Sequence, residues 1–231
     1  PRLAEDLATL LEALDLRGAI VIGHSMGGMT AMQFCGDFPE VLDARVAGIM
    51  LIATRAHQVL PPYVDRGARD LVRRGQAMLD AGRPLPARSQ LGDRIVRLAF
   101  GDRPSSPAVR IVAEMGESME PAALVGSVGG LIEHDARAAL RATSTPSMVI
   151  VGTRDLLTPV PAGRHLAHLL PDCDFVVLPR AGHQLMQERP DELAELLDGF
   201  VARIDGEAPS LGAAVADDPG PMAAADVEHH P

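Results

Sequence analysis

The sequence predicts an α/β fold in which a mostly parallel β-sheet is flanked by helices and interrupted by a helical insertion. Short apolar runs rich in β-branched residues recur along the chain, amphipathic segments separate them, and one proline-bearing region has helical pieces without a convincing strand. Continuously apolar strands are typical of a sheet covered on both faces, and alternation with helices implies helical crossovers, so the strands should be parallel. The four predicted strands are residues 19–23, 46–53, 147–152 and 174–179.

The predicted helices follow from the spacing of apolar residues. Near the start of the chain, leucines recur on one helix face, and Gly18 is a plausible stop for that helix. A second helix is expected from Met26 to Asp37, directly after the first strand. A helical stretch over residues 162–170 separates the last two strands, and another over 191–204 follows the fourth. The leucines of the first helix are Leu3, Leu7, Leu10, Leu11 and Leu14.

Four parts are expected along the chain. Residues 1–56 and 134–206 form the α/β core, and residues 57–133 form the helical insertion, which carries seven prolines. From Glu207 onward the sequence is small and polar, with too few large apolar side chains to offset the entropy lost on ordering. Residues 207–231 are therefore expected to form a disordered tail.

Composition excludes several classes of function. The chain of 231 residues has a net charge of −10, so it lacks the basic surface expected of a protein that binds nucleic acid or an anionic membrane. All 21 basic residues are arginine, which excludes Schiff-base and P-loop lysines; codon usage in a GC-rich genome accounts for the bias. Cys35 and Cys173 make no disulfide framework, and no apolar stretch reaches the roughly 18 residues of a membrane span. We expect a cytoplasmic protein without a metal site.

A Gly-x-Ser-x-Gly sequence follows the first predicted strand directly. Gly23, His24, Ser25, Met26 and Gly27 stand between an apolar strand and a helix, which is the setting of a nucleophile elbow. The serine of such a turn has a strained backbone, and the two glycines are expected where a side chain would strike the strand or the helix. The helix dipole and the Met26 backbone N–H would then face an oxyanion. A chance match in a structural turn is the alternative.

A serine hydroxyl is a weak nucleophile unless a base accepts its proton and a third group orients that base. Asp155 follows the third predicted strand and His183 follows the fourth, so both should lie at the same sheet edge as Ser25. Each alone could be an ordinary loop residue. The order Ser25, Asp155, His183 is nevertheless the one expected for this elbow, and it predicts a serine–histidine–aspartate triad.

Four stretches of the sequence resemble the α/β-hydrolase fold family. They are DLATLLEALDLRGAIVIGHSMGG, FPEVLDARVAGIMLIAT, DARAALRATSTPSMVIVGTRDLLTPV and LPRAGHQLMQERPDEL, and the similarity extends over residues 3–204 but is weakest over 57–133. The resemblance implies Ser25 as nucleophile, His183 as base and Asp155 as orienting acid, with the insertion as a lid or cap. Dehalogenase and epoxide-hydrolase relatives carry aspartate at the nucleophile position, so the serine implies an esterase or lipase.

The resemblance therefore implies cleavage of an ester, or a similar acyl bond, of a small and largely apolar substrate through an acyl-enzyme and without a cofactor. A cofactor-free haloperoxidase or perhydrolase is an alternative among similar proteins. A catalytically incomplete fragment acting as an interaction module is another, because the sequence begins inside a helical pattern and has no His-Gly pair. In the family, a His-Gly loop among upstream strands supplies the second oxyanion donor, so an N-terminally truncated sequence is expected.

Two further kinds of residue could line the site. His24 could contact substrate, although packing within the elbow is the more common role of a residue at this place. Met115 and Met119 could line an acyl-binding surface, but packing between helices of the insertion is favoured.

Other polar residues are assigned no chemistry. His165 and His168 share a helix face near Asp172, yet no further ligands follow at suitable spacing, so a solvated face is favoured over a metal site. His134 and Asp135 resemble the start of the helix that leads back into the sheet.

Overall fold

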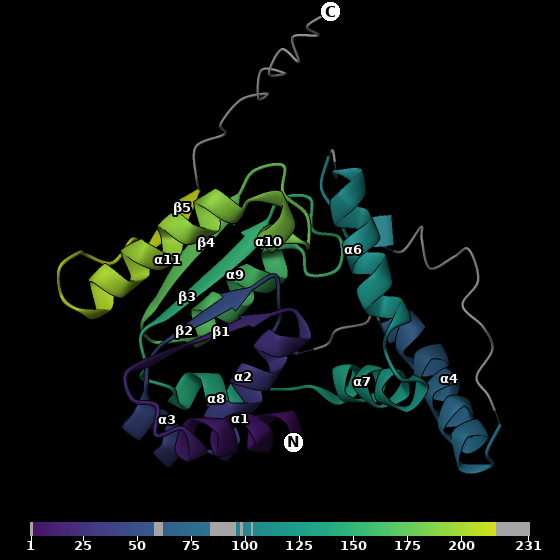
Figure 1. The fold of residues 1–231 in the computed structure, drawn as a ribbon. Coiled ribbons are helices and arrows are strands. Elements are labelled where there is room, and N and C mark those ends of the chain that lie inside the picture. The colour runs from purple at the N-terminus through teal and green to yellow at the C-terminus, as the bar shows by residue number, and fades with distance from the viewer. Residues whose placement is uncertain (1, 58–61, 84–95, 98, 103, 216–231) are drawn as a thin grey trace, which may run out of the picture.

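The computed structural model describes residues 2–57, 62–83, 96–97, 99–102 and 104–215. Within these residues the chain forms a five-stranded sheet in the order β1-β2-β3-β4-β5, and every neighbouring pair is parallel (Figure 1). The predicted α/β class and the four predicted strands are confirmed. The strands are β1 (Ala19–His24), β2 (Val46–Ile52), β3 (Ser147–Gly152), β4 (Cys173–Leu178) and β5 (Ala213–Val215).

Helices cover both faces of the sheet. They are α1 (Arg2–Ala13), α2 (Met26–Asp37), α3 (Pro39–Arg45), α8 (Arg137–Ala142), α9 (Val160–Leu169), α10 (Leu185–Glu188) and α11 (Pro190–Ile204). Successive strand residues point to opposite faces. Leu51 and Val149 accordingly belong to a core with α1, α2, α3, α8 and α9, and Met50 and Ile150 to a second core with α10 and α11 (Figure 1). None of the described helices is long and apolar enough to cross a membrane.

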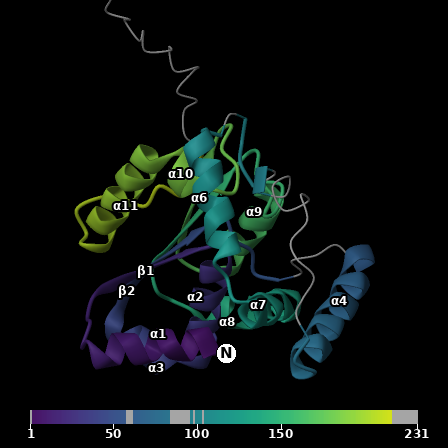
Figure 2. The ribbon, with the colours of Figure 1, turned by 45° about the vertical axis from the view of Figure 1, so that its right-hand side comes forward.

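Most of the described residues of the insertion are helical, although residues 99–102 are not. The helices include α4 (Pro62–Asp80), α6 (Ser106–Glu117) and α7 (Pro121–Glu133), which stand to one side of the sheet and its flanking helices (Figures 1 and 2). Helix α4 packs against α7. The two ends of the insertion meet, because His57 forms an isolated antiparallel bridge with Asp135, and the Ala136 N–H donates to the Ala56 carbonyl at 2.9 Å.

The end of the described chain departs from the predicted disordered tail. Strand β5 extends the sheet beside β4. The buried Asp174 carboxylate explains this order, because one oxygen accepts the Gly212 N–H at 2.8 Å and the other accepts from Arg203 at 3.1 Å. Hydrogen bonds thus anchor a segment that has few large apolar side chains. The prediction of disorder is wrong for residues 207–215, and residues 216–231 lie outside the described chain.

Parallel pairing brings several strand ends to one edge of the sheet. His24 at the end of β1 pairs with Ile52 at the end of β2, and Gly152 at the end of β3 pairs with Leu178 at the end of β4. The three loops that carry the predicted triad leave from this edge, where open parallel sheets place their ligands.

Candidate active site

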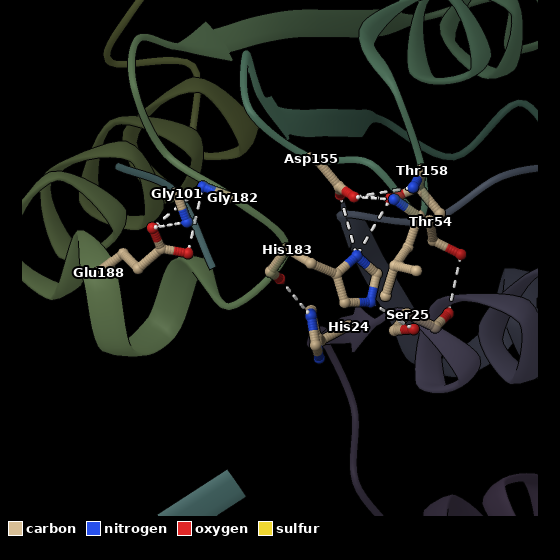
Figure 3. A network of polar contacts seen from close by, with 10 residues as sticks. His24, Ser25, Thr54, Gly101, Asp155, Thr158, Gly182, His183 and Glu188 are labelled. Carbon is tan, nitrogen blue, oxygen red and sulfur yellow. Dashed lines mark hydrogen bonds and ion pairs between the residues drawn. The ribbon is translucent and has the colours of Figure 1, made fainter. Parts of the chain in front are cut away.

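Ser25 stands in a sharp turn between β1 and α2, and the end of β2 holds its backbone. Its φ of 51° lies in the left-handed region, which a serine adopts only where its surroundings enforce it. The Ser25 N–H donates to the Ile52 carbonyl at 3.0 Å, and the buried Thr54 hydroxyl donates to the Ser25 carbonyl at 2.8 Å (Figure 3). These contacts stabilise the elbow conformation. The role of Thr54 was not predicted, because no local sequence signal indicates that a residue after β2 contacts the turn after β1.

Close packing of the elbow depends on two glycines. A Cβ atom on Gly23 would lie 2.6 Å from the Gly27 carbonyl oxygen, and one on Gly28 would lie 2.6 Å from Cγ2 of Thr54. Gly27, in contrast, has open space where a Cβ would be placed. The expected steric requirement for glycine is therefore confirmed for Gly23 and wrong for Gly27, because the tight contact falls one residue further along the helix.

The His183 ring lies between the serine and the aspartate. Its Nε2 atom is 2.9 Å from Ser25 Oγ, and its Nδ1 atom is 2.9 Å from Asp155 Oδ2 (Figure 3). His183 and Asp155 are both buried. Because a carboxylate oxygen only accepts, Nδ1 carries the proton of the neutral ring, and the lone pair of Nε2 faces the serine hydroxyl. In this arrangement a histidine can accept the serine proton.

The Asp155 carboxylate is held by its own loop as well as by His183. The backbone N–H groups of Leu157 and Thr158 each donate to Oδ1 at 2.8 Å, and the Thr158 hydroxyl donates to Oδ2. Burial by itself raises the pKa of Asp155, but the hydrogen bonds and charge interactions with His183 and Thr158 outweigh it and lower that pKa below its usual value. The carboxylate is therefore ionised at neutral pH.

Thr158 is a site residue that was not predicted from the sequence. Its buried hydroxyl lies beside both the acid and the base, 3.3 Å from His183 Nδ1. The aspartate accepts from the backbone two and three residues further on, so a local turn could have been predicted from the residue types. The contact between Thr158 and His183 could not have been predicted, because His183 lies in the loop after a different strand, β4.

His24 contacts the histidine loop. Its Nε2 atom donates to the His183 carbonyl oxygen at 2.8 Å, and the two ring centroids are 4.9 Å apart (Figure 3). Burial lowers the pKa of His24 and so favours its neutral ring, with the proton on the Nε2 atom that donates. These contacts support packing within the elbow, and contact between His24 and a substrate stays a prediction.

Met26 is the first residue of α2. Its backbone N–H is one of the donors that an α-helix leaves without an intrahelical acceptor, and it directly follows the serine. Its role as an oxyanion donor stays a prediction.

The histidines and aspartate considered as metal ligands have other partners. The His165 ring lies against that of His57, with centroids 5.1 Å apart, His168 donates to a carbonyl of its own helix, and Asp172 pairs with Arg203. Among the residues that the structure describes, no group of three or more histidine, cysteine, aspartate or glutamate side chains is placed to hold a metal.

The two methionines of the insertion are accessible. Met115 is 63% exposed and Met119 is 39% exposed, so the favoured interpretation of packing between helices does not hold for them. Asp135, assigned no chemistry, pairs with Arg137 at 2.6 Å.

Known proteins are similar to this chain over most of its length. A family model described as the alpha/beta hydrolase fold matches residues 1–190. A pimeloyl-[acyl-carrier protein] methyl ester esterase from Chromobacterium violaceum is 31% identical over 185 residues, which cover 78% of this chain and 68% of that protein. A Mycobacterium tuberculosis protein that carries the name non-heme bromoperoxidase BpoC is 29% identical over 204 residues, covering 86% of this chain and 74% of that protein.

A solved structure shows the same similarity. A thermophilic esterase from Thermogutta terrifontis matches with a TM-score of 0.73 and 25% identity, covering 87% of this chain and 71% of that one. The family model covers most of the chain, and the fold and strand-end geometry agree with it. The protein is a hydrolase, and the chain belongs to the alpha/beta hydrolase fold family.

Proposed function

We propose that this hydrolase cleaves an ester, or a similar acyl bond, through an acyl-enzyme on Ser25. The observation that supports it most is the continuous set of contacts from Ser25 Oγ through the His183 ring to Asp155, at 2.9 Å each. A hydroxyl, a base and an acid that orients the base are the groups that nucleophilic acyl transfer requires.

The first half of the reaction forms the acyl-enzyme. His183 Nε2 accepts the hydroxyl proton while Ser25 Oγ attacks the carbonyl carbon, and the carbonyl oxygen becomes an oxyanion. The Met26 N–H and the positive end of α2 stabilise that charge. When the bond to the leaving alcohol breaks, His183 returns the proton to the alcohol oxygen.

The second half releases the acid. A water molecule gives its proton to His183 Nε2 and attacks the acyl carbon, and the proton then returns to Ser25 Oγ. Asp155 stays ionised because its pKa is lowered, and its charge stabilises the protonated ring in both halves. These steps need no cofactor.

The names of the relatives support an ester as the substrate, and the local surface supports an acid part that is largely apolar. The Chromobacterium relative is named a methyl ester esterase, and the Thermogutta structure is that of an esterase. Directly after the proposed acid, Leu156 and Leu157 are 70% and 43% exposed. The name of the Mycobacterium relative favours a second candidate, a cofactor-free haloperoxidase or perhydrolase that uses the same serine.

We also propose that the helical insertion acts as a cap over the acyl group. Ile111 and Met115, one helical turn apart on α6, are 47% and 63% exposed and offer an apolar surface. Met115→Gln should raise KM for p-nitrophenyl octanoate more than for p-nitrophenyl acetate. Equal KM values in parent and variant for both esters would contradict this role.

A fluorophosphonate that reacts with activated serines tests the proposed nucleophile. The full chain should be labelled at Ser25 and should hydrolyse p-nitrophenyl butyrate, whereas Ser25→Ala should lose both properties. Ser118→Ala is a matched control, because it removes an exposed hydroxyl of the insertion, and it should keep both. Undiminished ester turnover in Ser25→Ala would contradict the proposal.

The second candidate is tested on the same protein with monochlorodimedone, bromide and hydrogen peroxide. Ester cleavage should be faster than bromination. The opposite order of rates would favour the haloperoxidase.

A further inference from the structure

A short segment of the insertion lies against the loop that carries His183. The backbone N–H groups of His183 and Gln184 donate to the Ala99 carbonyl at 2.8 and 3.1 Å. Ala99 and Phe100 are buried. The backbone of the proposed general base is thus supported by residues 99–101, which are far from it in the sequence.

Glu188 connects the same two segments through its side chain. It ends helix α10, five residues after His183. One carboxylate oxygen accepts the Gly101 N–H at 2.8 Å and the Gly182 N–H at 3.0 Å, and the other accepts the Gly182 N–H at 3.1 Å (Figure 3). Hydrogen bonds to an ionised acceptor are stronger than those between neutral groups.

Two glycines let the segments meet at this carboxylate. A Cβ atom on Gly182 would lie 2.3 Å from the Gly101 nitrogen, and a Cβ on Gly101 would lie 2.3 Å from the Arg180 carbonyl oxygen. The two backbones therefore touch directly, and both N–H groups point to Glu188. Without Glu188, two N–H groups in a tightly packed junction would lose their acceptor.

We infer that Glu188 is a positioning residue, which fixes residues 99–101 of the insertion against the histidine loop and thereby sets the place of His183. The inference rests on the proposed function for the role of His183, but the contacts of Glu188 do not depend on it. The His183 ring must keep two distances of 2.9 Å, from Nε2 to Ser25 Oγ and from Nδ1 to Asp155 Oδ2. A backbone shift of the loop changes both distances, and a misplacement of about 1 Å can lower a rate about 100-fold.

Steady-state kinetics with p-nitrophenyl butyrate tests this role. Glu188→Ala should lower kcat by about 100-fold and leave KM unchanged, because the variant changes the alignment of the base and not the substrate surface. Glu188→Gln should recover part of the loss, since its amide oxygen can still accept both N–H groups. Glu195→Ala, which removes an exposed carboxylate from α11, should match the parent. A kcat in Glu188→Ala equal to that of the parent would overturn the inference.

A proton NMR measurement separates this inference from the proposed function. The His183 Nδ1 proton, shared with Asp155, should give a downfield resonance in the parent and in Glu195→Ala. The resonance should be lost or broadened in Glu188→Ala. Amide exchange at Gly101 and Gly182 should also accelerate in Glu188→Ala, because both N–H groups lose their acceptor, and should change less in Glu188→Gln. An inactive parent that shows these changes would contradict the proposed function and still support the inference. An unchanged resonance together with unchanged amide exchange would overturn the inference, even if the parent is a good esterase.

Discussion

The Nε2 atom of His183 lies 2.9 Å from the Oγ atom of Ser25, although 158 positions separate the two residues in the chain. The parallel sheet explains this contact, because β1 and β4 end at the same edge of the sheet and the turn with Ser25 and the loop with His183 begin there. The sheet thus sets the distance between loops, while contacts within and between the loops set the alignment of the side chains.

If His183 and Asp155 act as one unit with Ser25, the activation free energies lost in the two single variants should not add up in the double variant. His183→Ala and Asp155→Asn should each lower kcat by about 10⁴-fold, and the double variant should be little worse than the worse single one. Steady-state kinetics on the three variants measures this. Losses that multiply in the double variant would show that the two residues act independently.

The Thr158 hydroxyl should support the ionised acid. Thr158→Val keeps the side-chain shape but removes the donor to Asp155 Oδ2, so the pKa of Asp155 should rise and the free energy of unfolding should fall by about 1.5 to 3 kcal/mol. Thr158→Ser retains the hydroxyl and should stay close to the parent. Urea unfolding at neutral pH compares the three proteins, and equal stability of the valine and serine variants would contradict this role.

The glycines of the elbow should differ in their tolerance of a methyl group. Gly23→Ala places Cβ 2.6 Å from backbone atoms that cannot move aside, and it should destabilise the fold by about 1 to 3 kcal/mol. Gly27→Ala meets open space and should be neutral or slightly stabilising. Thermal or urea unfolding of the two variants measures this difference, and a larger loss of stability in Gly27→Ala would contradict the close packing at Gly23.

Acidification should remove the stabilising contribution of Asp155. Although burial opposes ionisation, the contacts with His183 and Thr158 lower the Asp155 pKa below the ordinary value of 3.8. The contribution is therefore fully present above that value and is lost as the pH falls through the lower pKa of the folded state. Urea unfolding of the parent and Asp155→Asn should show a stability difference that narrows between neutral pH and about pH 3. A difference that widens on acidification would reverse the sign of the assigned shift.

The sequence by itself determined the first four strands and the places of the candidate residues. Strand β1 is a short apolar run that ends in Gly-x-Ser-x-Gly, and β3 and β4 are similar runs followed by Asp155 and His183. These are local patterns, because burial on both sheet faces requires apolar residues within each strand and a parallel sheet brings successive strand ends together. The catalytic roles of Ser25, Asp155 and His183 remain predictions that the variants above test.

Only the tertiary structure decided which groups hold those residues in alignment. The Glu188 contact joins positions 87 apart, Thr54 reaches the Ser25 carbonyl across 29 positions, and the Thr158 hydroxyl meets a histidine from the next strand's loop. Local patterns also gave a wrong prediction at Gly27, because the glycine that packs closely against Thr54 is Gly28. They gave another at β5, because hydrogen bonds to Asp174 order this segment. The spacing of apolar residues reports which face of an element is buried, but it does not report which distant donor or backbone atom that face will meet.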